Sequence, residues 1–484
     1  MALTLFAEGL SDRAAADAVQ GRTDWECPLG LPLADASFDS TVPCGFRSRL
    51  VAGGAEEALL DAVLEAATAH RLLRSGGRQR TDSTHVLAAV RAMNRAECVH
   101  ETLRHALEVP ALAAPGWLLE RALPHWATAH GPRALDDRLP KSAAKRAAWV
   151  RTVGEDGHRM LAAISAPGAP DRIARLPAVG SLRRAWVRQF HLAGGEVRWR
   201  TDREGIPPAA RFIGSPHDAD AHHARKSGKG WIGHKAHLSE TCDDSLPRVV
   251  TCARATAGPV ADGYVTPRVR RALRGKGLLP ARHVVDTGHL DAALLVETGR
   301  DFGIDSVGPP RPDPRWRAAA GKGFATDRDA PRATCPMGVR SSGRTPATDD
   351  RGAAVVKVEF SERDCRPCAH RVDCAGPKAA RRPMTPRTRD GYAALQAARQ
   401  RQRTPDLAAP CARRAGIEAT ISQAVRGFGL RRSRHFGHAK THLQHIAAAA
   451  AMDLIRLVHW NSCEPLAPTR RSHLSRLIHL QGAN

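Results

Sequence analysis

The sequence predicts an α/β protein whose mixed β-sheet is flanked by helices. Between residues 231 and 308, segments with strand patterns alternate with segments of helical periodicity. Aromatic residues make up only 4% of the chain, and hydrophobic residues 42%, which favours helices and buried strands. At 484 residues the chain is longer than one hydrophobic core usually fills, so we expect a main domain that carries insertions.

Residues 1–75 are predicted to form an N-terminal helical region. LSDRAAADAV opens with a Ser that can cap a helix, and GAEEALLDAVLEAATAHRLL spaces its apolar residues three and four apart. The opening LTLFAEGLSDR already has the pattern of a helix inside a core. We therefore expect an N-terminally truncated chain.

The first residues lack the basic region and cleavage site of a secretory signal. The longest apolar stretch, residues 446–458, is interrupted by Asp453 and Arg456, so it predicts a buried helix and not a membrane span. We expect a cytoplasmic protein without membrane contact, whose 11 cysteines are thiols or metal ligands.

The remaining elements follow in order. A first strand is expected within residues 76–85, ending at Asp82, and residues 86–230 are expected to be a helical insertion because residues 86–195 are rich in Ala, Leu and Arg. Polar and apolar residues alternate at 231–241 and at 248–256. These two segments flank a DDSLP turn and predict a β-hairpin. Four further elements are a helix over ADGYVTPRVRRALRGKG, a strand over ARHVVD, a helix over LDAALLVETGRDFG and a strand over IDSVGPP.

Residues 309–405 break this alternation, because Pro, Gly, Arg and clustered Cys replace the periodicity. The segment predicts an insertion with a small metal-stabilised module. Its cysteines are Cys335, Cys365, Cys368 and Cys374, in the patterns TCPMG, DCRPC and DC. A CxxC pair with two flanking cysteines can form a tetrahedral Zn²⁺ site, whereas the long separation of the first cysteine leaves free thiols as the alternative. Helices resume over 406–460, and 461–484 form a basic tail.

Three acidic residues occupy separate motifs: Asp82 in RTDSTHV, Asp286 in HVVDTGHLD and Glu418 in RRAGIEATISQ. Two strands and a helix can bring such side chains to one point, where hard oxygen ligands suit Mg²⁺ or Mn²⁺. Two such ions activate a water or hydroxyl and stabilise the leaving oxygen in phosphodiester displacement. Taken singly, each acid could instead cap a helix or close a turn. The alternatives at turns and helix starts, which suit capping better, are Asp243, Asp244, Asp262 and Asp291.

The chain is strongly basic. Its 73 Lys and Arg residues exceed its 49 Asp and Glu residues by 24, which suits displacement of counterions from a nucleic-acid backbone. A generic basic protein from an Arg-rich proteome is the alternative, and the scarcity of aromatic residues favours duplex over single-stranded partners. Positive charge is concentrated in residues 428–445, where Arg431, Arg432, Arg434 and Lys440 could contact phosphates. The same segment holds His435, His438, His442 and His445, which we expect to face solvent or phosphate rather than a metal.

Taken in order, these motifs resemble those of bacterial insertion-sequence transposases of the DDE (Asp-Asp-Glu) class, which have an RNase H-like core of the retroviral integrase superfamily. The resemblance runs over nearly the whole chain and includes the cysteine cluster. Its motifs are GLSDRAAADAV, GRQRTDSTHVLAAV, GHKAHLSETCDD, HVVDTGHLDAALL and AGIEATISQAVRGFGLRRSRHFGHAKTHLQH. It implies that Asp82, Asp286 and Glu418 hold two Mg²⁺ or Mn²⁺ ions that support DNA cleavage at element ends and strand transfer into target DNA.

The resemblance also implies the partners: double-stranded DNA with terminal inverted repeats, target DNA, and a second copy of the chain in the DNA complex, associated with the nucleoid. Related transposases carry Tyr, Arg, Glu and a further basic residue at the spacing occupied here by Cys411, Arg414, Glu418 and Arg426. Arg414 and Arg426 would therefore clamp DNA phosphates.

Cys411 and His289 stand where the family usually has Tyr. These departures favour the alternative of a DNA-binding remnant without catalytic activity, and a related nuclease without strand transfer is a third hypothesis. The chain has no GxxxxGK[ST] motif, so an ATP-driven mechanism is not supported.

Overall fold

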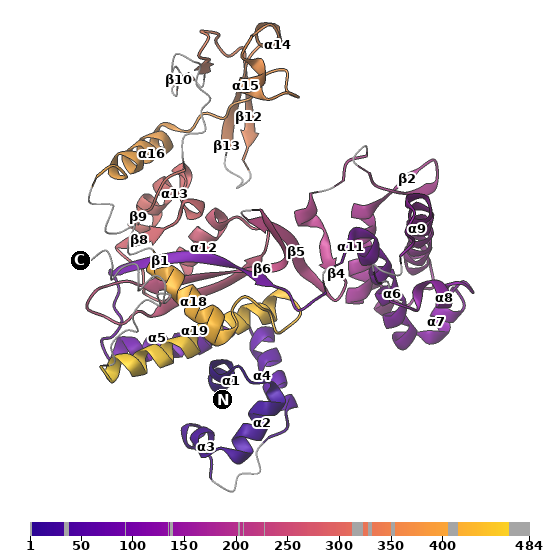
Figure 1. Ribbon diagram of the computed structural model, residues 1–484, viewed down its shortest axis with the longest axis horizontal. Coiled ribbons are helices and arrows are strands. Elements are labelled where there is room, and N and C mark those ends of the chain that lie inside the picture. The colour runs from indigo at the N-terminus through magenta and orange to yellow at the C-terminus, as the bar shows by residue number, and fades with distance from the viewer. Residues whose placement is uncertain are drawn as a thin grey trace, which may run out of the picture.

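The computed structural model describes residues 2–32, 38–91, 93–133, 135, 139–201, 204–206, 208–226, 228–311, 323–327, 332–349, 354–404 and 415–463. A mixed sheet lies at the centre, with helices packed against it and further units extending above, below and to the side in Figure 1. Among the described residues, no helix is both long enough and apolar enough to cross a membrane.

The central sheet has seven strands. Their order is β4-β5-β6-β1-β8-β9, and β7 pairs with β6 on the same side as β5. Strand β6 is antiparallel to its three neighbours, whereas β1, β8 and β9 are parallel. The expected mixed α/β sheet is thus confirmed, including the hairpin of β6 and β7. The strands are β1 (Arg78–Leu87), β4 (Ile213–Ser215), β5 (Asp218–Lys226), β6 (Lys229–Thr241), β7 (Val250–Ala257), β8 (Arg282–Val285) and β9 (Asp305–Val307).

Strand β1 differs from its prediction, because Asp82 lies in its middle and not at its end. Polar residues continue the strand, and its pairing with β6 runs from Gln79 to Leu87. The buried hydroxyl of Thr81 hydrogen-bonds Ser239 on β6 and His283 on β8, both at 2.6 Å. Since these polar groups are satisfied inside the sheet, the strand carries no apolar alternation that a sequence pattern could detect.

Helices α5 (Ala58–Ala69), α18 (Gly416–Phe428) and α19 (His438–Asn461) lie together below the sheet in Figure 1. Their apolar faces join the sheet in one core that includes Leu60, Leu238 and Ile421. Helix α12 (Asp262–Gly275) follows β7, and α13 (Ala292–Glu297) precedes β9. Because α5 contributes to this core, the last helix of the expected N-terminal region packs as part of the central unit.

The first four helices form a smaller cluster beneath the sheet in Figure 1. They are α1 (Ala2–Glu8), α2 (Asp12–Gly21), α3 (Thr23–Leu29) and α4 (Thr41–Ala52). Helix α2 has the expected cap, since Ser11 Oγ accepts a hydrogen bond from the Ala14 amide. Leu5, Phe6 and Trp25 form a core of their own, which reaches α19 through Ala447.

The expected helical insertion is helical over its first two thirds. Its helices are α6 (Arg95–Ala113), α7 (Pro115–Leu119), α8 (Trp126–His130), α9 (Ala143–Ser165), α10 (Asp171–Ala174) and α11 (Pro177–Gln189). Trp126 and Trp186 lie buried in its core. After Gln189 the chain turns to strands, namely the hairpin of β2 (Phe190–Ala193) and β3 (Glu196–Trp199) and then β4 and β5 of the central sheet. The prediction of helix up to residue 230 is therefore wrong for this last part.

The described part of the segment after β9 contains two small two-stranded sheets and three helices, and it extends above the sheet in Figure 1. Helix α16 packs against α13, so it connects this segment to the central unit. Phe324, Val358 and Phe360 form the core of the small sheets. The elements are β10 (Ala325–Asp327), β11 (Arg332–Thr334), β12 (Gly343–Thr348), β13 (Ala354–Glu359), α14 (Glu362–Cys365), α15 (Arg371–Ala375) and α16 (Arg389–Arg401).

Candidate metal and DNA site

The register of two parallel strands brings Asp82 beside Asp286. Thr81 of β1 pairs with Val285 of β8, and the next residue on each strand is the aspartate. Paired positions of parallel strands point to the same face, so both carboxylates lie on one side of the sheet. Ligand atoms of Asp82, Asp286 and His289 all lie within 4.8 Å of one another. Two residues distant in sequence thus form one acidic cluster at the sheet centre.

Glu418 approaches the same place from α18. It lies in the first turn of the helix, where a negative charge is favoured by the helix dipole. Asp82 and Glu418 line one pocket, together with Ser83, Arg426 and Arg431. Asp82 is therefore common to two groups, because it belongs to the cluster with Asp286 and also lines a pocket with Glu418. Among the described residues, the ligand sets within 4.8 Å do not include Glu418.

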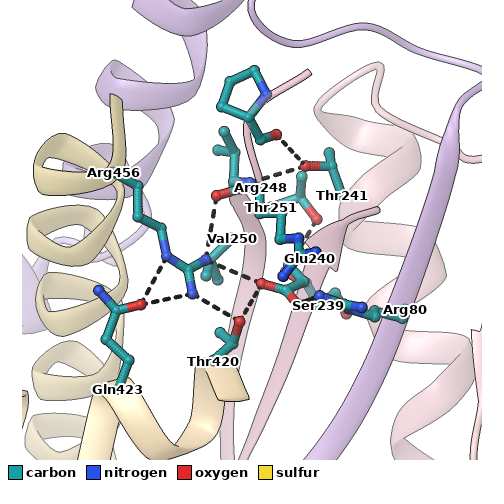
Figure 2. Close-up of polar contacts among 12 residues, drawn as sticks. Arg80, Ser239, Glu240, Thr241, Arg248, Val250, Thr251, Thr420, Gln423 and Arg456 are labelled. Atoms are coloured by element: carbon teal, nitrogen blue, oxygen red, sulfur yellow. Dashed lines mark hydrogen bonds and ion pairs between the residues drawn. The ribbon is translucent and has the colours of Figure 1, made fainter. Parts of the chain in front are cut away.

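A buried ion-pair network holds α18 in this position (Figure 2). Arg80 and Glu240 are cross-strand partners on β1 and β6, only 2% and 0% exposed, with their closest atoms 2.6 Å apart. The second oxygen of Glu240 accepts from Thr420 on α18 at 2.6 Å and from Arg456 on α19 at 3.0 Å. One carboxylate thus links two strands to the two helices below them.

Close packing at the start of α18 adds a second constraint. A Cβ at Gly416 would lie 2.1 Å from a terminal nitrogen of Arg80, so only glycine allows the helix to approach the buried guanidinium. Arg456 also donates to Gln423 on α18 at 2.9 and 3.0 Å (Figure 2). Since Glu418 lies two residues from Gly416, these contacts set its distance from Asp82.

The chain beyond α18 returns to β1. The amide of Leu87 donates to the Arg431 carbonyl, and the Ser433 amide donates to the Leu87 carbonyl, both at 2.8 Å. The Arg431 side chain donates to Thr84 at 2.9 Å. Helix α18 is therefore fixed to β1 at both ends, with the acidic cluster between them.

The environment of Asp82 disfavours its negative charge. Burial raises the pKa of the Asp82 carboxyl, the hydrogen bond from the Ser83 amide at 2.7 Å lowers it, and the nearby charge of Asp286 raises it further. The net direction is upward. A divalent cation would remove this electrostatic cost, since it supplies the charge that two adjacent carboxylates lack.

Asp286 also caps a turn. This role was the alternative that the sequence left open for each acid. Its Oδ1 accepts from the His289 amide at 3.1 Å and closes the single 3₁₀ turn over Thr287–His289. One carboxylate can do both, because its remaining lone pairs stay available to a cation. Capping also orients the carboxylate toward Asp82.

His289 is fully buried behind the two aspartates. Its Nδ1 lies 3.0 Å from the hydroxyl of Thr266 on α12, and its Nε2 has no hydrogen-bond partner among the described residues. Nε2 lies 4.0 Å from Asp286 Oδ1. Burial lowers the pKa of His289, so the imidazole is neutral near pH 7, although the charges of Asp262, Asp286 and Asp82 act in the opposite direction.

A second set of ligand atoms adjoins the first. His237, Asp262 and His289 also come within 4.8 Å of one another. Asp262 lies 3.1 Å from the ammonium of Lys235, and this ion pair already neutralises its carboxylate. The first set, Asp82 and Asp286 with His289, contains two carboxylates and so offers more hard oxygen ligands to a cation.

A third such set lies in the helical insertion. His125 and His130 contact the same oxygen of Asp156, at 2.9 and 2.8 Å. Hydrogen bonds account for this arrangement, because each ring can donate to the buried carboxylate. We interpret it as a polar link between α8 and α9.

The basic residues predicted to contact DNA differ in their surroundings. Arg426 and Arg431 line the pocket of Asp82 and Glu418, and Arg432 and Lys440 are exposed nearby on the chain. Arg434 instead packs on the N-terminal helices, with its guanidinium 5.8 Å from the Phe6 ring centre and donating to the Leu10 carbonyl. This contact gives Arg434 a structural role that the sequence did not suggest. Arg414 and Cys411 lie outside the described residues.

The four histidines at 435–445 are less exposed than expected. His438 and His442 contact the backbone of Ala255 on β7, and His445 is fully buried. Burial lowers the pKa of His442 to about 4 and that of His445 to about 3. For His442 and His445, the expectation that the side chains face solvent or phosphate is wrong, because helix α19 packs its histidine-bearing face on the sheet.

Cys335, Cys365, Cys368 and Cys374 are half-buried free thiols around the small sheets. Burial raises the pKa of Cys365, and the neighbouring Cys374, Cys335 and Cys368 act in the same direction. They therefore lie near one another. Among the described residues, the ligand sets that come within 4.8 Å do not include them.

Comparison with known proteins adds an independent observation. Residues 334–458 match the family model described as Transposase DDE domain. The match covers roughly a quarter of the chain and supports a DDE transposase. It includes the cysteines, Glu418 and helices α16, α18 and α19, whereas Asp82 and Asp286 lie outside it. No curated protein matches the sequence.

Sequence reasoning missed one member of the cluster. His289 was recognised only as a departure from the family pattern, whereas the structure brings it to Asp82 and Asp286. Its position three residues after Asp286 was the available signal, since a strand end followed by a tight turn keeps such residues close. The charge of Lys226 lowers the pKa of both Asp82 and His289, and no feature of the sequence indicated this residue.

Proposed function

We propose that this protein is a DNA transposase in which Asp82, Asp286 and Glu418 hold two divalent cations and support cleavage and strand transfer. One observation carries the proposal: the three acids come from β1, the end of β8 and α18, yet Asp82 adjoins both of the others. The match of residues 334–458 to a transposase DDE domain supports the same class.

The donor chemistry fits Mg²⁺ or Mn²⁺. Three carboxylates offer hard oxygen ligands, and burial together with the nearby charge of Asp286 raises the pKa of Asp82. When bound, such cations supply an activated water or 3′ hydroxyl and neutralise charge at the phosphate.

Residues of the chain would hold the cations and bind the DNA phosphates. Asp82 is common to the cluster of Asp286 and the pocket of Glu418, so it would contribute to holding both cations. Glu418 would complete the second position, and the network around Glu240 would fix its approach. Arg426 and Arg431 line the same pocket and would hold DNA phosphates against the acids. We assign the same phosphate-binding role to Arg414, Arg432 and Lys440.

We further propose that the core is RNase H-like and is formed by residues 76–85, 231–308 and 406–460, with β4 and β5 of the following insertion extending its sheet. In this scheme the chain also has an N-terminal helical region at 1–75, insertions at 86–230 and 309–405, and a basic tail at 461–484. The cysteine cluster would bind a structural Zn²⁺. The partners would be the inverted repeats and target DNA of the nucleoid, bound by a homodimer.

The test uses the purified full-length chain, Mg²⁺, and labelled duplexes that carry the ends of the encoding element. Asp286→Asn is compared with Asp291→Asn, which makes the same chemical change five residues away at a helix cap that Asn also serves. Nicking that is lost only in Asp286→Asn supports the proposal. Binding without nicking by the unaltered chain indicates a DNA-binding remnant, and nicking without joined products indicates a nuclease.

A further inference from the structure

We propose that His289 is a nitrogen ligand of the cation held by Asp82 and Asp286, and that it biases this position toward Mn²⁺ over Mg²⁺. This inference rests on the proposed function, because it concerns the same acidic cluster. It goes beyond that function by adding a ligand of a different chemical kind.

The hydrogen bonds of Thr266 favour the tautomer of His289 that is protonated at Nδ1. The Thr266 hydroxyl lies 3.2 Å from the Asp262 carbonyl, one turn earlier in α12, and donates to it. The same hydroxyl lies 3.0 Å from Nδ1 of His289, so it accepts a hydrogen bond from Nδ1–H. A neutral imidazole protonated at Nδ1 has its lone pair on Nε2.

That lone pair faces the acidic cluster. Nε2 of His289 is buried without a hydrogen-bond partner among the described residues, which is costly for a polar atom. Its 4.0 Å separation from Asp286 Oδ1 is too long for a hydrogen bond. It is compatible with a shared cation, because two ligands on opposite sides of one ion are about 4.2 Å apart.

The surroundings of the ring match those of metal-binding histidines. Such histidines donate their other ring N–H to a partner that fixes the tautomer, and Thr266 fills this role. The other charged groups around the ring are Asp262 with its partner Lys235, and Lys226.

A mixed set of carboxylate and imidazole changes the preferred metal. Mg²⁺ takes oxygen ligands almost exclusively, whereas imidazole binds more strongly to the later divalent metals, beginning with Mn²⁺. The unaltered site should therefore favour Mn²⁺, and loss of the imidazole should affect Mn²⁺ far more than Mg²⁺.

The experiment measures nitrogen coordination directly. Full-length protein loaded with Mn²⁺ is examined by pulsed electron paramagnetic resonance, with natural and ¹⁵N-histidine labelling. We expect a ¹⁴N coupling that changes to a ¹⁵N coupling on labelling. Absence of any histidine coupling in the unaltered protein overturns the proposal, whatever the variants do.

Two variants assign the coupling. His289→Ala removes the ligand, and His289→Phe keeps a ring in the buried site without a lone pair. Both should lose the coupling and bind Mn²⁺ at least about tenfold more weakly in calorimetry, with less than about a threefold change for Mg²⁺. His85→Ala, which removes a half-buried histidine from β1, is the control and should retain the coupling. Persistence of the coupling in both His289 variants would contradict the proposal.

Asp82→Asn and Asp262→Asn separate the possible failures. If Asp82→Asn abolishes Mn²⁺ binding while the His289 variants leave it unchanged, the acidic site survives and the His289 ligand is rejected. If Asp82→Asn leaves binding unchanged, the acidic site itself fails. If only Asp262→Asn removes binding, the cation lies in the set of His237 and Asp262, and the proposed ligand set is rejected.

Discussion

Two buried polar clusters on strand β1 differ in how they handle charge. Around Arg80, the carboxylate of Glu240 is shared by two guanidinium groups and a hydroxyl, so its negative charge is compensated within the protein. Two residues further, Asp82 gathers a second aspartate and a buried histidine, and its pKa is raised. One cluster stabilises the position of α18, whereas the other brings two carboxylates and an imidazole within 4.8 Å of one another. Burial alone does not mark a functional site, because Arg80 and Asp82 are both buried and only Asp82 belongs to a set of possible metal ligands.

Asp82→Asn should have the largest effect, because it should reduce cleavage without reducing stability. Loss of a cation ligand should reduce Mg²⁺-dependent DNA cleavage by roughly 10³-fold, since metal ions supply several kcal/mol of transition-state stabilisation. The free energy of unfolding should not decrease, because Asn removes a charge that burial disfavours. Cleavage assays and urea unfolding measure the two effects. A variant that unfolds more easily and still cleaves DNA would reverse the roles assigned to the two clusters.

Glu240→Gln tests the compensated cluster. Removing the charge leaves Arg80 buried without its partner, so the free energy of unfolding should fall by about 3 kcal/mol. Urea unfolding gives this value. Glu362→Gln is the control, because its ion pair with Arg366 is exposed and should contribute less than about 0.5 kcal/mol. Equal effects of the two substitutions would mean that the buried network does not stabilise α18.

Thr266→Val tests whether the hydrogen bond between His289 and Thr266 strengthens metal binding at the acidic cluster. Without the hydroxyl, the His289 ring loses the partner that fixes its tautomer, and Mn²⁺ affinity should fall about tenfold. Calorimetric titration provides the readout. Thr152→Val, which removes a helical hydroxyl bonded to the Ala148 carbonyl, should leave the affinity unchanged. Unchanged affinity in Thr266→Val would separate the hydrogen bond from metal binding.

The pH dependence of stability should reveal a third buried carboxyl, Asp453, near the compensated cluster. Burial raises its pKa well above the ordinary value of 3.8, although Arg456 and the Val250 amide oppose the shift. Above pH 3.8 the group ionises on unfolding and releases a proton, so stability should fall as pH rises toward the folded-state pKa and level off beyond it. Unfolding midpoints across this window should show the decline in the unaltered chain and less of it in Asp453→Asn. If stability changed equally with pH in the unaltered chain and in Asp453→Asn, other groups would cause the pH dependence.

The smallest expected effects concern DNA binding. Arg431→Ala should weaken duplex binding severalfold and reduce the magnitude of the salt slope by about one, as expected for one lost phosphate contact. Arg434→Ala should leave the slope unchanged, because its guanidinium packs on Phe6 and Leu10. Binding isotherms at several salt concentrations compare them. A larger slope change in Arg434→Ala would show that the packing contact opens on DNA.

Sequence patterns predicted the sheet wherever apolar periodicity was strong. The hairpin of β6 and β7, helix α12 and strands β8 and β9 all occur where they were expected. Strand β1 was misjudged because its buried residues are polar and satisfied by Ser239, His283 and Glu240, which only the folded sheet supplies. Strands β4 and β5 were missed because they lie in residues 196–230, which the prediction included in the helical insertion although its Ala-, Leu- and Arg-rich stretch ends near residue 195.

The candidate site was predictable in part. Motif order singled out Asp82, Asp286 and Glu418, and the register of β1 and β8 explains why the first two meet. His289 was not predicted as a ligand, because its orientation depends on Thr266, a contact between α12 and the turn after β8. Arg434 was assigned to DNA for its charge alone, and a sequence does not reveal which side of a loop a guanidinium takes.

Anomalous diffraction from crystals of the full-length chain soaked in Mn²⁺ tests the central claim most directly. We expect a peak about 2.0–2.3 Å from carboxylate oxygens of both Asp82 and Asp286, with Glu418 bordering the same density or a second peak. Density confined to another part of the molecule, with both aspartates uncoordinated at saturating Mn²⁺, would contradict it.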